Sequence, residues 1–188
     1  MCYATNPANS KIYPKREVAQ LCSTTQINPP DLNSFVKIVT VDGHGATMVD
    51  GVTPITGDFS ESSVPPSEND YSLGLLIGFG DLHYVTLGDL DGDYASSSYG
   101  YTYNNVEAVV APRVGQVDLY HVNHHGSSHS SSNDLLSVIN PTVSLISCGV
   151  DNSYGHPDQT VLNRLLSYGD VYLTSDCDTS RNYASSQR

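Results

Sequence analysis

The sequence predicts an α/β fold for the C-terminal half of the chain. Beyond position 105, short β-branched runs alternate with runs of helical apolar periodicity, an order that implies βαβ units with right-handed crossovers. Two apolar runs before them, at 73–79 and 83–87, are separated by Gly80-Asp81, which is typical of a β-hairpin. The hairpin is expected to add antiparallel strands to the parallel ones.

Individual elements are predicted from their own residues. The strand segments are short and rich in β-branched or apolar residues, and they comprise residues 36–41, 117–122, 142–147 and 171–173. The helical segments comprise residues 106–110, 134–139 and 158–168. We expect Pro112 to end the first helix and Gly169 to close the third. Ser132 or Asn133 is expected to cap the second.

Residues 1–66 are interpreted as an irregular N-terminal segment with one strand, and residues 67–188 as the α/β part. Asn, Pro, Thr and Ser dominate the first part of the chain, where we expect at most a short helix around residues 16–22. Gly, Ser and Pro are frequent in residues 42–66, which predicts a long loop.

The composition restricts the classes of function. The net charge is −12 with only 8 Lys and Arg residues, so the surface repels nucleic acid unless metal ions supply a local attraction. No apolar run approaches the ~20 residues that a membrane span needs, and the first residues show no basic region followed by an apolar one, the pattern of a signal peptide. Few charges, many Ser and Tyr residues and 4 Cys fit a secreted protein, although an acidic cytosolic protein has the same composition.

The cysteines bear on this location. Cys148 and Cys177 follow two strands that a short helical crossover makes parallel and neighbouring. The pair should therefore lie about 5 Å apart and form a disulfide. Cys2 and Cys22 are a second candidate pair, and the alternative for Cys148 is a buried free thiol. Two disulfides would indicate an oxidising compartment.

Candidate site residues follow the ends of three predicted strands. Asp89 follows the run 83–87, the pair His124-His125 follows 117–122, and His156 follows 142–147. Carboxylate and imidazole are ligands of zinc and other transition metals, and such ions generate a nucleophile from bound water. Each signal alone has an ordinary alternative: a solvated acidic turn, a surface histidine, or a turn before a helix.

Taken in order, the segments 69–73 (NDYSL), 87–90 (LGDL), 124–127 (HHGS) and 154–157 (YGHP) resemble the metallo-β-lactamase-fold domain of the ComEC competence family and its soluble relatives. The resemblance covers about residues 68–176. It implies a four-layer αββα sandwich, of which this chain supplies the C-terminal half. The metals of that fold lie at the edge of its two sheets.

The resemblance also implies roles for individual residues. Asp89 would bridge two zinc or manganese ions in the complete site. His124 would be a metal ligand, with His125 in its place if the alignment shifts by one residue. His156 would handle substrate or a proton, so that Asp89, His124 and His156 form the catalytic set. Residues 69–70 (Asn-Asp) would lie close behind them.

One part of the family pattern is missing. The first metal motif, His-x-His/Asp-x-Asp-His, is absent, and the lone His44 does not replace it. We therefore expect a further segment, from the same longer protein or from a second chain, to carry it. The expected function is a metal-dependent hydrolase whose metal-bound hydroxide attacks a small or polymeric phosphodiester or ester. The alternative is a non-catalytic interaction module that kept the fold and lost the metals.

Overall fold

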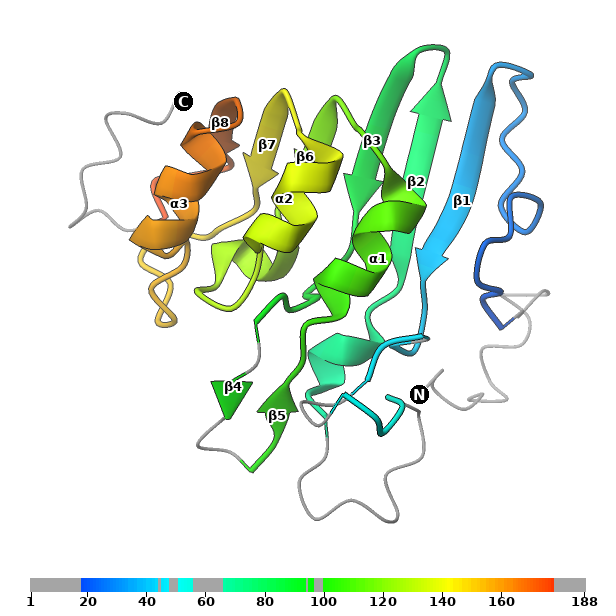
Figure 1. The fold of residues 1–188 in the computed structure, drawn as a ribbon. Coiled ribbons are helices and arrows are strands. Elements are labelled where there is room, and N and C mark those ends of the chain that lie inside the picture. Colours follow the sequence, from blue (N-terminus) through cyan, green and yellow to red (C-terminus); the bar gives the residue numbers. More distant parts are fainter. Residues whose placement is uncertain are drawn as a thin grey trace, which may run out of the picture.

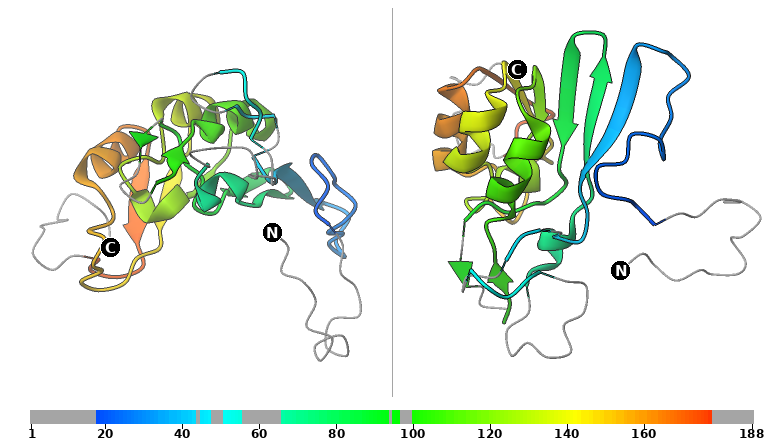
Figure 2. Two further views of the ribbon diagram at one scale, coloured as in Figure 1. Left: turned by 90° about the horizontal axis from the view of Figure 1, so that it is seen from below. Right: turned by 45° about the vertical axis from the view of Figure 1, so that its right-hand side comes forward.

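The computed structural model describes residues 18–43, 45–47, 51–55, 66–93, 95–96 and 100–177. In this part of the chain, six strands form one mixed sheet in the order β1-β2-β3-β6-β7-β8. Three α-helices lie together on one face of that sheet (Figures 1 and 2). The predicted α/β class is therefore confirmed.

The sheet combines an antiparallel and a parallel half. The antiparallel strands are β1 (Ser34–Thr40), β2 (Gly74–Phe79) and β3 (Leu82–Thr86). The parallel strands are β6 (Leu119–His121), β7 (Val143–Ile146) and β8 (Asp170–Leu173). The predicted hairpin and the parallel βαβ order are both confirmed, and β3 joins the two halves by pairing in parallel with β6.

The helices are α1 (Val106–Val114), α2 (Asn133–Ile139) and α3 (Gln159–Leu166). Ser132 caps α2, since its hydroxyl accepts a hydrogen bond from the Leu135 amide. The expected end of α1 at Pro112 is wrong. The helix continues to Val114 and closes at Gly115, because Ala111 and Val114 are buried in the core and hold the last turn in place.

Three further features of the secondary structure differ from the prediction or were not predicted. Residues 18–22 form a turn rather than a helix, and residues 16–17 lie outside the described part. The short pair β4 (Ala95–Ser96) and β5 (Thr102–Tyr103) was not predicted, since strands of two residues carry no periodicity. Two 3-10 turns, η2 (Glu68–Tyr71) and η3 (Asn123–Gly126), carry candidate site residues.

The core lies between the helices and the sheet face that they cover. Tyr120 on β6 has no exposed surface, and its hydroxyl contacts Ser131 Oγ at 2.9 Å. The other large side chains of this core are equally enclosed, and they include Val85, Leu135, Leu136, Ile139, Ile146, Leu162 and Leu165. Such burial accounts for most of the stability that the helices gain.

The opposite face of the sheet is also apolar but remains partly exposed. Alternate residues of each strand point to this face. The strand register then places residues of adjacent strands side by side on it. These residues are Leu75, Ile77, Tyr84, Leu119, Val143, Leu145 and Tyr172, and each is intermediate in burial. We call this set the open sheet face. None of the three α-helices covers it (Figure 2).

Candidate functional site

The candidate residues come together at the ends of β3, β6 and β7. His125 Nε2 lies 3.8 Å from Asp89 Oδ1. The rings of His124 and His156 have their centroids 5.6 Å apart. Side chains from three separate loops thus share one edge of the sheet, as expected for the carboxyl ends of strands in an α/β fold.

His125 is held in an orientation that leaves one nitrogen available. Its Nδ1 lies 2.7 Å from the backbone oxygen of Ser147. A carbonyl oxygen can only accept, so Nδ1 must carry the proton, and Nε2 of the neutral ring then presents a lone pair. That lone pair lies beside the carboxylate of Asp89, and both side chains are about half exposed, at 51% and 46%.

His124 is oriented by a buried carboxylate instead. Its Nδ1 lies 2.9 Å from Asp91 Oδ1, and the side chain of Asp91 has no exposed surface. Burial alone would lower the pKa of His124, but the hydrogen bond and the charge of Asp91 outweigh it and raise the pKa. Burial also raises the pKa of Asp91, against the opposing hydrogen bond from His124. Asn69 Nδ2 lies 3.4 Å from the same nitrogen of His124.

The pKa of His156 is shifted in the opposite direction from that of His124. Burial, followed by the charges of His124 and His125, lowers the pKa of His156. Its ring therefore stays neutral near pH 7 and can accept a proton. The Tyr154 ring stacks on it, with centroids 5.9 Å apart and planes inclined by 14°.

His121 is a fifth candidate that sequence reasoning did not select. It ends β6 beside Thr86 of β3, and its Nδ1 lies 3.2 Å from the Thr86 hydroxyl oxygen. Burial and the charge of His125 lower its pKa, whereas Asp89 opposes the shift. The strand pattern contained the signal, because alternation places residue 121 on the open sheet face, at the edge where Asp89 follows β3.

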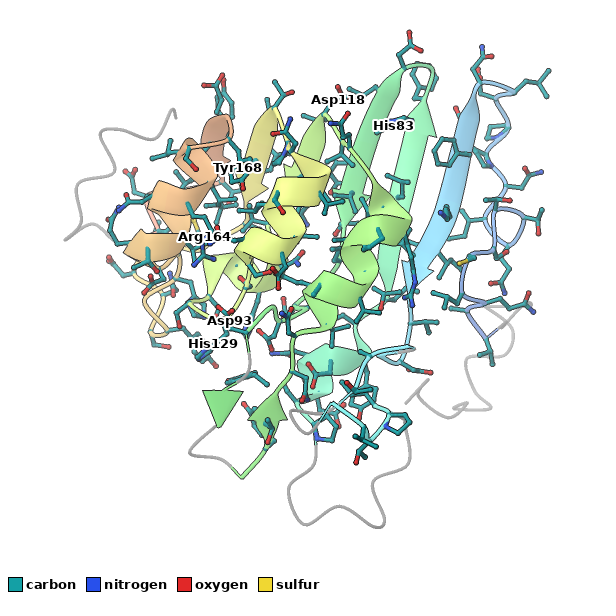
Figure 3. All side chains as sticks on the ribbon, in the orientation of Figure 1. His83, Asp93, Asp118, His129, Arg164 and Tyr168 are labelled. Carbon is teal, nitrogen blue, oxygen red and sulfur yellow. A yellow bond between two sulfur atoms is a disulfide. The ribbon has the colours of Figure 1, made fainter. Side chains whose placement is uncertain are left out.

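A buried glutamate shapes the loop that carries the histidine pair. Glu107 on α1 is fully buried and accepts hydrogen bonds of 2.7 Å from the Asn123 side chain and from the amides of Ser131 and Ser132. Burial raises its pKa to about 7 despite these donors. Arg164 of α3, labelled in Figure 3, adds a bond of 2.6 Å to the Ser131 carbonyl oxygen. The loop is thus fixed from two helices.

The two histidine loops also contact each other directly. Gly126 has a φ of 78°, and a Cβ there would lie 2.7 Å from the Pro157 side chain, so glycine is required for this approach. The Asp158 amide donates to the Gly126 carbonyl oxygen at 2.8 Å. These contacts bring the ring of His156 against that of His124.

Asp70 supports the site without reaching the histidines. It is fully buried, its Oδ2 accepts a hydrogen bond of 2.7 Å from Asn104, and burial raises its pKa to about 7. Among the described contacts of residues 69–70, the one that reaches a candidate histidine is that of Asn69. His44 lies outside the described residues.

The donor set fits part of a metal site. Two donors bound tetrahedrally to one ion at 2.0–2.2 Å stand about 3.3–3.6 Å apart, and the His125 and Asp89 atoms, at 3.8 Å, are separated by slightly more than this. Within the described ranges, no group of three or more His, Cys, Asp or Glu side chains is arranged to hold a metal ion. A catalytic zinc normally takes three protein ligands, so further donors would be needed.

A pocket of about 410 Å³ opens beside these imidazoles. Its lining comes from the loops after β6 and β7, and comprises His125, Ser147, Cys148, Gly149, Asn152, Tyr154 and His156. The expected Cys148–Cys177 disulfide is present, with a Cα separation of 5.3 Å, and it forms part of this wall. The second candidate pair is not formed, since Cys22 is free and exposed; Cys2 lies outside the described residues.

No described helix is both long and apolar enough to cross a membrane.

No family model matches the chain. Three curated proteins are similar to parts of it. ComE operon protein 3 of Bacillus subtilis is 28% identical over 123 residues, which is 65% of this chain and 15% of the relative.

Recombination protein 2 of Haemophilus influenzae is 30% identical over 105 residues, which is 56% of this chain and 12% of the relative. Competence protein ComA of Neisseria gonorrhoeae is 30% identical over 109 residues, or 58% of this chain and 14% of the relative. The matches thus span less than a sixth of each relative. The chain is similar to proteins with competence-related names over rather more than half of its length.

Proposed function

We propose that this chain is the C-terminal half of a metallo-β-lactamase-fold hydrolase domain that cleaves a phosphodiester or ester. The observation that carries the proposal is the 3.8 Å approach of His125 Nε2 to Asp89 Oδ1. Both groups are accessible, and the bond from His125 Nδ1 to the Ser147 carbonyl oxygen leaves Nε2 as the ring nitrogen that faces Asp89. Zinc or manganese, two ions in the complete site, would supply a hydroxide nucleophile near neutral pH.

The residues divide into binding and proton-handling roles. Asp89 and His125 are the first pair of ligands, and His124 is a further donor through its Nε2. The Asp91 carboxylate orients His124 in the manner usual for metal-bound imidazoles, whose other ring nitrogen donates to a carboxylate. The pKa of His156 is lowered, so its ring is neutral near pH 7. It can accept a proton from the substrate side of the site and return it to the product.

The remaining ligands must come from a segment that lies against the open sheet face. An apolar face of this kind is stabilised when a second sheet packs on it. Figure 2 shows the α-helices on the other side only. The relatives are several times longer than their matched regions, which fits a segment from the same protein, and a second chain is the alternative source. The Cys148–Cys177 disulfide supports secretion into an oxidising compartment.

The alternative function is a non-catalytic interaction module. It would use the open sheet face for binding, and the approach of His125 to Asp89 would have no metal to hold. The absence of a three-residue metal group among the described side chains is compatible with this alternative.

Calorimetric titration of the full chain with Zn²⁺ decides between the two. We expect binding that is lost in Asp89→Asn and in His125→Ala and kept in Asp81→Asn, an exposed aspartate in the turn between β2 and β3. If wild type and Asp89→Asn bind Zn²⁺ equally, or if neither binds it, the hydrolase proposal fails and the interaction module is favoured.

A further inference from the structure

The Cys148–Cys177 disulfide joins two segments just beyond the paired strands β7 and β8. The strand pairing ends at Ile146 and Leu173, and the disulfide lies past it with a Cα separation of 5.3 Å. Cys177 has no exposed surface, whereas Cys148 is partly exposed in the pocket wall. The cross-link thus closes the sheet at the end where the candidate site lies.

One half of the cystine is connected to His156 through Asn152. The Asn152 amide and its Nδ2 donate to the Cys177 carbonyl oxygen, at 3.4 Å and 3.2 Å. The same Nδ2 donates to the His156 carbonyl oxygen at 2.7 Å, and Oδ1 accepts from the His156 amide at 3.0 Å. The Asn152 side chain therefore bonds both the amide and the carbonyl group of His156, and it links this residue to the backbone of Cys177.

The other half of the cystine adjoins the group that orients His125. The Ser147 carbonyl oxygen, which accepts the Nδ1 proton of His125, directly precedes Cys148. Cys148 is itself held by Thr174, whose hydroxyl accepts from the Cys148 amide at 2.9 Å and donates to its carbonyl oxygen at 3.0 Å. Ser175 Oγ donates to that oxygen at 2.8 Å.

We propose that the Cys148–Cys177 disulfide and Asn152 together are the positioning element of this site, and that the site is consequently sensitive to redox state. Reduction by a dithiol would cleave the S–S bond, take up two electrons and two protons, and leave two thiols. The loop between Cys148 and His156 has little apolar anchoring of its own, since Val150 and Tyr154 are 60% and 83% exposed. Without the cross-link, the described contacts that hold this loop to the segment after β8 are hydrogen bonds of Thr174, Ser175 and Asn152, so that the loop and the Ser147 carbonyl become more mobile.

This inference rests on the proposed function only for what the site binds; the positioning itself is a property of the metal-free chain. Its first test therefore needs no metal. Nuclear magnetic resonance of the full chain would record the Nδ1–H proton of His125 and the hydrogen exchange of the His156 amide. In the oxidised chain both should be protected. After reduction, and in Cys148→Ser/Cys177→Ser, the His125 signal should be lost and His156 should exchange at least about tenfold faster.

Matched variants separate positioning from unfolding. Cys22→Ser removes a free, exposed cysteine and should respond to reduction as the wild type does. Asn152→Ala should release the His156 amide but leave the His125 signal, because only the first depends on its side chain. Core methyl signals from Val85 and Leu162 should stay unchanged in every form. If they do not, the variants are unfolded, and the reduced wild type at low temperature serves as the comparison.

A second readout is the Zn²⁺ affinity of Cys148→Ser/Cys177→Ser, which lacks the cross-link without freeing a zinc-binding thiol and should bind about 10- to 100-fold more weakly than the oxidised wild type, as when the hydrogen-bond partner of a metal ligand is removed. If the oxidised wild type fails to bind Zn²⁺, the proposed function is wrong while the magnetic resonance result still decides the positioning. If His125 and His156 give identical signals before and after reduction in the folded chain, the positioning role is overturned.

Discussion

His124 Nδ1 lies 2.9 Å from Oδ1 of Asp91, a carboxylate without any exposed surface. A charge-assisted bond in such an environment fixes both the ring plane and the nitrogen that carries the proton. The neighbouring Asp89, by contrast, is accessible and lies beside His125. Two aspartates separated by one residue thus have different partners: Asp91 is buried and orients a ring, and Asp89 is open to ligands.

This difference leads to the first prediction, for Asp91→Asn. Because the Asp91 carboxylate raises the pKa of His124 against the effect of burial, the substitution should lower that pKa. It should also weaken Zn²⁺ binding by about 10- to 100-fold. Imidazole titration by magnetic resonance and calorimetry measure the two effects. Asp93→Asn, an exposed neighbour labelled in Figure 3, is the control. An unchanged His124 titration would contradict the assignment.

Sequence reasoning succeeded where the signal was local. The strands of the six-stranded sheet and α2 were predictable because apolar periodicity and a capping serine are properties of a few adjacent residues. The convergence of Asp89 with the histidine loop was also predictable, since the carboxyl ends of neighbouring parallel strands meet at one edge. The Cys148–Cys177 bond followed from the same topology.

The remaining features depend on contacts between distant segments. Glu107 was unremarkable in sequence, and its role arises only because α1 packs where Asn123, Ser131 and Ser132 present donors. Aspartates occupy positions 89, 91 and 93, and this pattern alone could not show that Asp91 is the one that is buried. The continuation of α1 past Pro112 likewise depends on the burial of Val114 in the core.

A second prediction concerns pH and Asp70. Burial raises the Asp70 pKa from its ordinary 3.8 to about 7, so the folded chain keeps a proton that the unfolded chain releases. The stability contributed by this group is therefore full below about pH 4 and is lost as the pH rises to 7, by about 4 kcal/mol. In Asp70→Asn this loss should be absent.

Urea unfolding at several pH values between 4 and 7 checks the Asp70 prediction. The difference in unfolding free energy between wild type and Asp70→Asn should change steadily across this range. Asp81→Asn, which alters an exposed carboxylate, should show a constant difference from wild type. A pH-independent difference for Asp70→Asn would show that the carboxyl is ionised in the folded chain.

A third prediction is that the pure chain is a poor catalyst. Asp89, His125 and His124 would have to serve two ions in the complete site, which leaves each ion short of the three protein ligands that catalytic zinc normally takes. With Zn²⁺ or Mn²⁺ added, hydrolysis of a chromogenic phosphodiester should be no faster than with Asp89→Ala. Turnover should appear when a segment that carries the missing metal motif is supplied. Rapid metal-dependent turnover by the chain alone would refute the proposed incompleteness.

The last prediction tests the open sheet face through two adjacent residues of β2. Leu76 points to the helices and is 7% exposed, whereas Ile77 points to the open face beside Tyr84. Leu76→Ala should therefore lower the unfolding free energy by about 2–5 kcal/mol. Ile77→Lys should change it by no more than about 1 kcal/mol and should reduce both self-association in sedimentation and the binding of a hydrophobic dye. Equal destabilisation by the two substitutions would mean that both faces are buried in the isolated chain, and that no further segment is needed to cover the sheet.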